Sequence, residues 1–144
     1  MKIGELARIA QCSVETIRFY EKEALLAAPA RTSGNFRHYN AEHVERLRFI
    51  RNCRALDMSH EEIHTLIRLA DQPIDSCNAI NSVFDQHIQH VETRIQQLEQ
   101  LKQQLAHLRQ QCQIEHAVDP CGILQGLAGM PFEAKLDKAK THLG

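Results

Sequence analysis

Three cysteines in the second half of the chain have a spacing that could bind a metal ion. Cys77 and Cys112 lie 35 residues apart, and Cys121 follows nine residues later, beyond a proline. Thiolates are soft ligands, and three together suit large soft cations such as Cd(II), Pb(II) or Hg(II). Structural zinc would usually take a fourth ligand. The other two cysteines, Cys12 and Cys53, are interpreted as core residues or inert thiols.

The first two of these cysteines begin and end an apolar seam. Residues 76–112 contain no Pro or Gly, which predicts one long helix. Along it a side chain of the seam recurs every seven residues, as in a coiled coil. The seam consists of Cys77, Phe84, Val91, Leu98, Leu105 and Cys112. At 1.5 Å per residue its two cysteines are about 52 Å apart, so they cannot meet within one helix.

An antiparallel homodimer removes this difficulty. A two-fold axis near Arg94–Ile95 would place the partner subunit's Cys77 beside Cys112 and Cys121. The symmetry predicts one three-thiolate site at each end of the dimer. An inter-chain disulfide between the partner subunit's Cys77 and Cys112, which would make a thiol-redox sensor, is the alternative.

His87 and His90 form a second, minor candidate metal site on the same helix. They stand at positions i and i+3, a spacing compatible with metal binding, and Glu62 or His64 of the preceding helix could approach them. Histidines on helices are commonly solvent-exposed surface residues, so this spacing alone does not decide between the two interpretations.

The first half predicts the elements that would carry a DNA-binding surface. Two short helices, a hairpin and two further helices are expected, with Ser13 and Asn40 as helix caps and Ser59 with Glu62 as a capping box. The ranges are residues 3–11, 13–23, 31–39, 40–56 and 59–69. Two short helices followed by a hairpin are typical of a winged helix-turn-helix.

Arginines follow these elements in order. They lie on the second helix, beside the hairpin and on the third helix, at Arg18, Arg31, Arg37, Arg48, Arg51 and Arg54. The planar guanidinium group suits both phosphates and guanine edges. Ser13 and Thr16 can bond phosphate or base edges at the start of the second helix. Phe19, Phe36 and Phe49 are interpreted as core residues.

Composition limits the remaining choices. The formal net charge is −1, which divides into +2 for residues 1–70 and −3 for residues 71–144, so a basic head is joined to an acidic stalk. No signal peptide or membrane span is expected, and the chain is predicted to be soluble and cytoplasmic. No nucleophile–base pair or pair of carboxylates indicates an enzyme.

Residues 16–21 (TIRFYE), 31–39 and 47–58 resemble the MerR family of bacterial transcription regulators, and the resemblance covers roughly residues 1–127. It implies a homodimer that binds a palindromic operator within an over-long promoter spacer. The DNA-facing positions that the resemblance implies are Ser13, Thr16, Arg18, Tyr20, Arg31, Arg37 and Arg54.

The second half is similar to the metal-responsive members of that family. Residues 75–77, 87–92 and 121–125 look most like the cadmium/lead-responsive regulators, and the mercury sensors share a similar cysteine layout. The expectation is repression without metal, and activation of a metal-resistance promoter with Cd(II) or Pb(II). Distorted DNA would then realign the contact sites for RNA polymerase. Zn(II) or Hg(II) remain alternatives.

These inferences predict a mainly α fold. Residues 1–70 would form the winged helix-turn-helix with its small β-hairpin wing, and residues 71–112 the linker and the long antiparallel coiled-coil dimerisation helix. Residues 113–130 would form the metal-binding loop with a short helix, and residues 131–144 a flexible tail.

Overall fold

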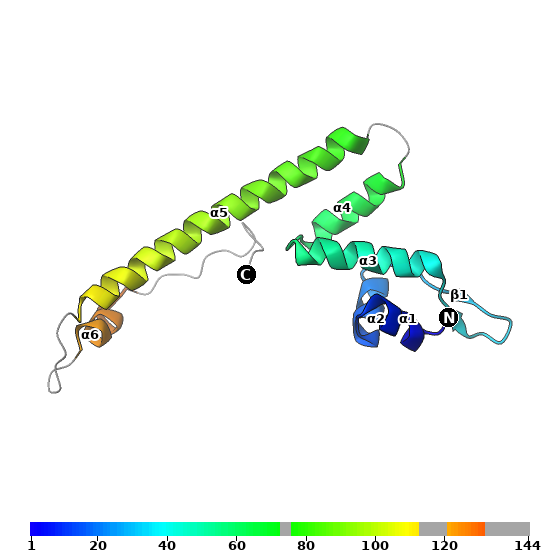
Figure 1. Cartoon of the computed structure of the whole chain (residues 1–144), viewed down its shortest axis with the longest axis horizontal. Helices are drawn as coiled ribbons and strands as arrows, with labels where there is room; N and C mark the ends of the chain where they lie inside the picture. The colour runs from blue at the N-terminus through cyan, green and yellow to red at the C-terminus, as the bar shows by residue number, and fades with distance from the viewer. Residues whose placement is uncertain (73–75, 113–120, 132–144) are drawn as a thin grey trace. The chain divides into compact units, whose positions relative to one another are not determined.

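The computed structural model describes residues 1–72, 76–112 and 121–131 (Figure 1). These residues form α1 (Ile3–Ala10), α2 (Val14–Lys22), β1 (Ala30–Arg31), β2 (Arg37–His38), α3 (Ala41–Ala55), α4 (His60–Ala70), α5 (Ser76–Gln110) and α6 (Gly122–Gly129). The predicted mainly α fold is confirmed. The chain divides into two compact units, Met1–Asp85 and Gln86–Gly144. Most of the predicted linker, much of the metal-binding loop and most of the predicted tail lie outside the described residues.

In the first unit, a tight turn separates α1 from α2. α1 ends at Ala10, and its C-cap residue Gln11 has a left-handed backbone (φ 55°). Ser13 caps α2 by accepting a hydrogen bond from the Thr16 backbone N–H at 3.0 Å, which satisfies one of the amides that a helix start leaves unpaired. Leu6 of α1 and Ile17 of α2 are fully buried in one cluster. The predicted helix-turn-helix therefore forms around a shared core.

The wing is a very short antiparallel hairpin. Ala30 pairs with His38 and Arg31 with Arg37, and the turn between them is closed by the Thr32 N–H donating to the Phe36 carbonyl at 2.8 Å. Asn35 adopts the left-handed conformation (φ 63°), which asparagine tolerates better than most residues. The hairpin predicted over residues 31–39 is thus present, with its strands reduced to two residues each.

One buried tyrosine joins this wing to α2. Tyr39 is fully buried, and its hydroxyl donates to Glu21 Oε1 at 2.5 Å. Arg37 Nη1 lies 3.8 Å from Glu21 Oε2. The carboxylate of Glu21, which is on α2, therefore receives a hydrogen bond and an ion pair from the end of the wing.

α3 and α4 pack as a second helix pair. Ser59 and Glu62 form the predicted capping box, with the Glu62 N–H donating to Ser59 Oγ at 3.1 Å and the Ser59 N–H to Glu62 Oε1 at 2.9 Å. Ile50, Met58 and Ile63 are buried in the cluster that holds the pair together. Local capping and apolar spacing thus agree on the same element boundaries.

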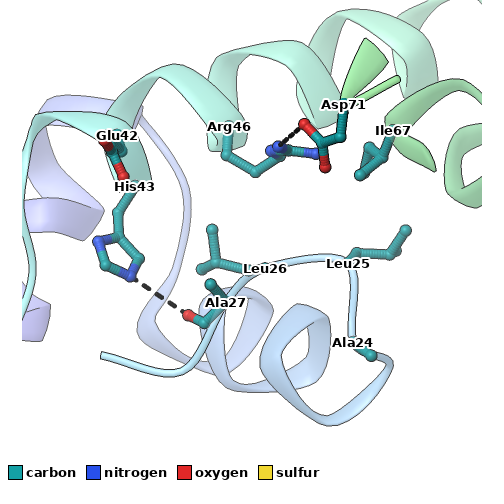
Figure 2. Close-up of a pocket in the computed structure, with 9 residues that line it drawn as sticks. All are labelled: Ala24, Leu25, Leu26, Ala27, Glu42, His43, Arg46, Ile67 and Asp71. Atoms are coloured by element: carbon teal, nitrogen blue, oxygen red, sulfur yellow. Dashed lines mark hydrogen bonds and ion pairs between the residues drawn. The ribbon is translucent and has the colours of Figure 1, made fainter. Parts of the chain in front are cut away.

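His43 and Arg46 connect α3 to its neighbours, as Figure 2 shows. The Asn40 backbone N–H donates to His43 Nδ1 at 3.2 Å, and His43 Nε2 lies 3.2 Å from the Ala27 carbonyl. A carbonyl can only accept, so the Nε2–H of His43 donates to Ala27. Arg46 Nη2 lies 3.6 Å from Asp71 Oδ1 at the end of α4. These contacts hold the segment after α2 against α3 and α4.

α5 runs for 35 residues and carries a stripe of exposed apolar side chains. The stripe consists of Phe84, Ile88, Val91, Ile95, Leu98, Leu101 and Leu105, and its members are between 38% and 60% exposed. Among the described residues, no helix is long and apolar enough to cross a membrane.

The predicted core role of the phenylalanines is wrong. Phe19 is 43%, Phe36 69% and Phe49 37% exposed. α2 turns only one fully buried side chain, Ile17, towards the core, so Phe19 remains at the surface. Phe36 lies in the turn of a hairpin whose strand residues are all exposed. Leu56, the C-cap residue of α3, is also apolar and is 58% exposed.

The Tyr39–Glu21 contact predicts a pH dependence of stability. Burial and the neighbouring Glu21 raise the pKa of Tyr39 to about 12. The unfolded chain releases this proton near pH 10 and the folded protein retains it, so the stabilisation is complete below about pH 10 and is lost as the pH rises towards 12. We expect the free energy of unfolding of Tyr39→Phe to fall less steeply with rising pH than that of the natural protein. Thermal unfolding followed by circular dichroism from about pH 9 to about pH 11 measures this, and parallel curves would contradict it.

Candidate nucleic-acid interface and metal centre

The start of α2 carries two of the predicted DNA-facing residues. Ser13 Oγ and Thr16 Oγ1 lie 2.8 Å apart, and Ser13 also caps the helix. Both hydroxyls therefore sit at a helix N-terminus, where the unpaired amides and the helix dipole favour an anion. Their first role is structural, and the same geometry would present a polar, electropositive edge to a phosphate.

Further along α2, basic side chains surround an open hollow. Arg18 and Lys22 of α2 and Arg37 of β2 line it, together with Glu21 and Ile3. Glu21 is engaged by Tyr39 and Arg37, so its charge is largely compensated. The basic side chains of this hollow thus have the chemistry that binding a phosphate requires. Lys22 was missed from the sequence, although its position four residues after Arg18 puts both on one face of the helix.

Three further arginines of the DNA-binding head make internal hydrogen bonds, and two of them, Arg31 and Arg54, are predicted DNA-facing residues. Arg31 Nη1 donates to the Asn35 carbonyl at 3.2 Å and shapes the turn of the wing. Arg54 Nη1 donates to the Met58 carbonyl at 2.6 Å, and Arg51 Nη1 to Gln11 Oε1 at 2.8 Å. A guanidinium group has five N–H donors, so one internal bond orients it while others remain for DNA. Arg48 is exposed on α3.

The structure brings two of the three predicted metal-binding cysteines together. Cys112, just after α5, and Cys121, the N-cap residue of α6, share a hydrogen bond between their sulfur groups. Cys77 is exposed in the first turn of α5. Cys53 is buried, as predicted, and Cys12 is half-buried against the core of α1 and α2. The metal role predicted for Cys77, Cys112 and Cys121 stays a prediction.

The electrostatics of the pair favour a thiolate at Cys121. Backbone N–H groups of Leu124 and Ile123 at the start of α6, and then Cys112, lower the pKa of Cys121. The same sulfur contact raises the pKa of Cys112, which is left as the proton donor of the pair. Arg109 adds positive charge, and its Nη1 donates to the Cys112 carbonyl at 2.9 Å. A lowered thiol pKa is what metal binding and thiol reactivity both require.

A close approach of α6 to the end of α5 positions Cys121. A Cβ atom at Gly122 would lie 2.1 Å from the Gln111 carbonyl oxygen, and one at Gly126 would lie 2.2 Å from Gln111 Oε1 and 3.0 Å from Leu108 Cδ2. Gly129, one turn further on, has open space around it. The glycine after Cys121 therefore lets the two thiols meet, a role that spacing alone did not indicate.

His87 and His90 lie on α5 as predicted. Their ring centroids are 6.2 Å apart and the rings are perpendicular. His87 is 6% exposed and His90 is half-buried. The predicted metal role of this pair stays a prediction.

Known families and proteins match this chain over most of its length. Residues 1–70 match the family described as MerR HTH family regulatory protein, and residues 44–108 match the family described as MerR, DNA binding. The HTH-type transcriptional regulator ZntR homolog of Haemophilus influenzae is 46% identical over 132 residues, which are 92% of this chain and 97% of that protein.

Two solved structures have the same architecture. The transcription regulator PbrR691 from Ralstonia metallidurans CH34, in complex with lead(II), has a TM-score of 0.79 at 46% identity, with 88% of this chain and 98% of that chain covered. The regulator MerR from Bacillus megaterium MB1, in complex with mercury(II), has a TM-score of 0.73 at 26% identity, with 89% and 99% covered.

Together with the basic helix-turn-helix surface, these similarities define a class of protein, namely the transcription regulators that bind DNA. The chain belongs to the MerR family, and it is a metal-responsive member of that family rather than an enzyme. Regulators of this family bind promoter DNA and dimerise. The resemblance found in the sequence is thereby confirmed.

The basic hollow makes a prediction for Lys22. If Lys22 faces a phosphate, Lys22→Gln should weaken operator and non-specific binding by a similar factor, and the slope of log affinity against log salt concentration should fall by about one. Lys102→Gln on α5 removes the same charge outside the DNA-binding head and should leave the slope unchanged. Fluorescence anisotropy with labelled operator at several salt concentrations measures both. An unchanged slope for Lys22→Gln would remove this residue from the interface.

Proposed function

We propose that the protein represses a metal-resistance promoter in the absence of metal, and activates it when Cd(II) or Pb(II) binds to three thiolates. The contact between Cys112 and Cys121 is the observation that carries this proposal. It supplies two sulfur ligands at one point, one of which has a lowered pKa. The third ligand is the partner subunit's Cys77.

The exposed apolar stripe of α5 supports the dimer that this site needs. Val91, Ile95 and Leu98 are 38%, 60% and 47% exposed near the midpoint between Cys77 and Cys112. Seven-residue repeats of this kind are buried by a second helix. An antiparallel arrangement centred near Arg94–Ile95 makes the two ends of the seam equivalent, so each dimer has two sites.

The donor set supports a soft, large cation. Three thiolates without a fourth protein ligand suit Cd(II), Pb(II) or Hg(II) better than structural zinc. The lead(II) complex of PbrR691, at 46% identity, favours the cadmium/lead assignment over mercury. The mercury(II) complex at 26% identity keeps Hg(II) as the first alternative, with Zn(II) behind it.

In the proposed mechanism Cys112, Cys121 and the partner subunit's Cys77 would hold the ion and so join the segment around Cys121 to the partner's α5. Metal can favour activation only if it binds more tightly to one arrangement of the two DNA-binding heads than to the other. Each DNA-binding head, which holds the operator through Arg18, Arg37 and their neighbours, then changes the twist and bend of the DNA. Untwisting an over-long spacer would realign the promoter contact sites for RNA polymerase. We place the protein in the cytoplasm with this promoter.

Mixed dimers test whether the site is shared between subunits. Neither Cys77→Ser nor the double variant Cys112→Ser, Cys121→Ser can form a complete site in its own homodimer. In the mixed dimer, the Cys77 of one chain meets the intact pair of the other, so one complete site returns. We expect no tight Cd(II) binding by either homodimer and one equivalent per mixed dimer, measured by thiolate-to-metal charge-transfer absorption under reductant. A mixed dimer that binds no metal would contradict the shared site.

Competition among Cd(II), Pb(II), Hg(II) and Zn(II) for the reduced dimer tests the selectivity. We expect Cd(II) and Pb(II) to displace Zn(II), and transcription from the cognate promoter in vitro to rise with them.

The adjacent sulfurs of Cys112 and Cys121 also favour a second candidate, a thiol-redox sensor. Activation by oxidant in the presence of a chelator, with no response to metal under reductant, would establish that candidate and overturn the metal proposal.

A further inference from the structure

The short helix α6 lies against the end of α5 through two of its glycines (Figure 1). Gly122 and Gly126 stand four residues apart and therefore share one face of α6. A Cβ atom at position 122 would overlap the backbone carbonyl of Gln111, and one at position 126 would overlap the Gln111 side chain and touch Leu108. A Cβ atom at Gly129 would meet nothing within 4 Å. At its first two glycines α6 thus approaches α5 more closely than a larger residue would allow.

Space, rather than backbone conformation, makes glycine necessary at position 122. Among the described residues no glycine has a positive φ, so alanine could adopt the backbone of α6 and would favour the helix more than glycine does. The obstacle at position 122 is a backbone carbonyl, which cannot move unless the end of α5 moves with it. The obstacles at position 126 are the ends of flexible side chains. Gly122 is therefore the residue on which this docking depends most.

The docking joins two cysteines whose backbones are held by the chain itself. The Cys112 N–H donates to the Arg109 carbonyl at 3.3 Å, and the Cys112 carbonyl accepts from Arg109 Nη1 at 2.9 Å. Cys121 is the N-cap residue of α6, and its carbonyl accepts from the Gln125 N–H at 3.0 Å. The sulfur groups of the two cysteines share a hydrogen bond. All of these partners are groups of one chain, so the fold alone brings the two thiols together.

We propose that Gly122 is a positioning residue of the thiolate site, because the docking that it permits holds Cys112 and Cys121 together as a ready-made pair of ligands. The inference rests on the metal-binding function proposed above and adds the residue that sets the affinity of that site. An ion that meets two ligands side by side does not have to order the segment that carries Cys121, so less of its binding free energy is lost as entropy. Gly122 itself has no ligand atom and acts only through this docking.

Exchange with glutathione, in the presence of a chelator, measures the pairing of the two thiols without metal. In the Cys77→Ser background, the dithiol and glutathione disulfide give an intrachain Cys112–Cys121 disulfide and two molecules of reduced glutathione. The equilibrium constant of this exchange reports the effective concentration of one thiol beside the other. We expect Gly122→Ala to lower it about ten-fold, as overpacking against a backbone does, and Gly129→Ala to leave it unchanged. Peptide mass spectrometry verifies which cysteines are joined.

Substitutions on the other side of the contact separate docking from helix propensity. Gly126→Ala should lower the effective concentration less than Gly122→Ala does, and Gln111→Ala should restore most of that loss, because the added methyl group meets the Gln111 side chain. Gln111→Ala should not rescue Gly122→Ala, whose methyl group meets the backbone. If these glycines influenced only the stability of α6, the alanine substitutions would all act in one direction and Gln111→Ala would rescue none of them.

Cd(II) titration of the glycine variants with Cys77 intact connects the pairing to the site. We expect Gly122→Ala to weaken Cd(II) binding by a similar factor of about ten, read from charge-transfer absorption under reductant, and Gly129→Ala to bind as the natural protein does. An unchanged exchange constant or an unchanged Cd(II) affinity in Gly122→Ala would overturn the positioning role and leave the metal function standing.

A natural protein that binds no Cd(II) would instead overturn the metal function and, with it, the role of Gly122 in that site, whatever the exchange shows. Thermal unfolding checks that each variant folds. If Gly122→Ala folds poorly, Gly126→Ala with and without Gln111→Ala decides the matter, and a loss that Gln111→Ala does not restore would overturn the proposal.

Discussion

The apolar stripe along α5 is the constraint on which the proposed dimer and its metal site depend. A 35-residue helix cannot fold its own stripe inwards, and side chains such as Ile95 and Leu105 are 60% and 59% exposed in one chain. Exposing them to water costs roughly 25 cal/mol for each Å² of apolar area. In the proposed dimer a second copy of the same helix removes this cost, and its antiparallel orientation determines which cysteines meet. In this proposal dimerisation and metal sensing are linked through one surface.

The DNA-binding head depends on a different kind of interaction, namely polar contacts between elements distant in the sequence. Glu21 of α2 is held by Tyr39 and Arg37 from the end of the wing, and His43 joins α3 to the segment after α2. The hydrogen bonds of Tyr39 and His43 are half-buried, so each is worth more than a surface ion pair. They set the angle between recognition helix and wing, which a regulator that reads DNA shape must keep constant.

Local structure was predictable to a large extent because its causes are local. The Ser13 and Asn40 caps, the capping box of Ser59 and Glu62, and the hairpin around Asn35 all follow from residues within four positions of one another. Side-chain burial was less predictable. Phe19 and Phe36 are apolar, yet no neighbouring layer covers them, and hydrophobicity alone does not report the presence of such a layer.

The candidate sites show the same division. The sequence by itself determined the residue types, the seven-residue seam and the basic order of helix, turn, helix and wing, because these depend on spacing along the chain. Only the tertiary structure decided that Cys121 meets Cys112, that Arg31 and Arg54 make internal bonds, and that Lys22 lines one hollow with Arg18 and Arg37. Each of these depends on how elements pack against one another, and packing between distant segments leaves no periodic signal in the sequence.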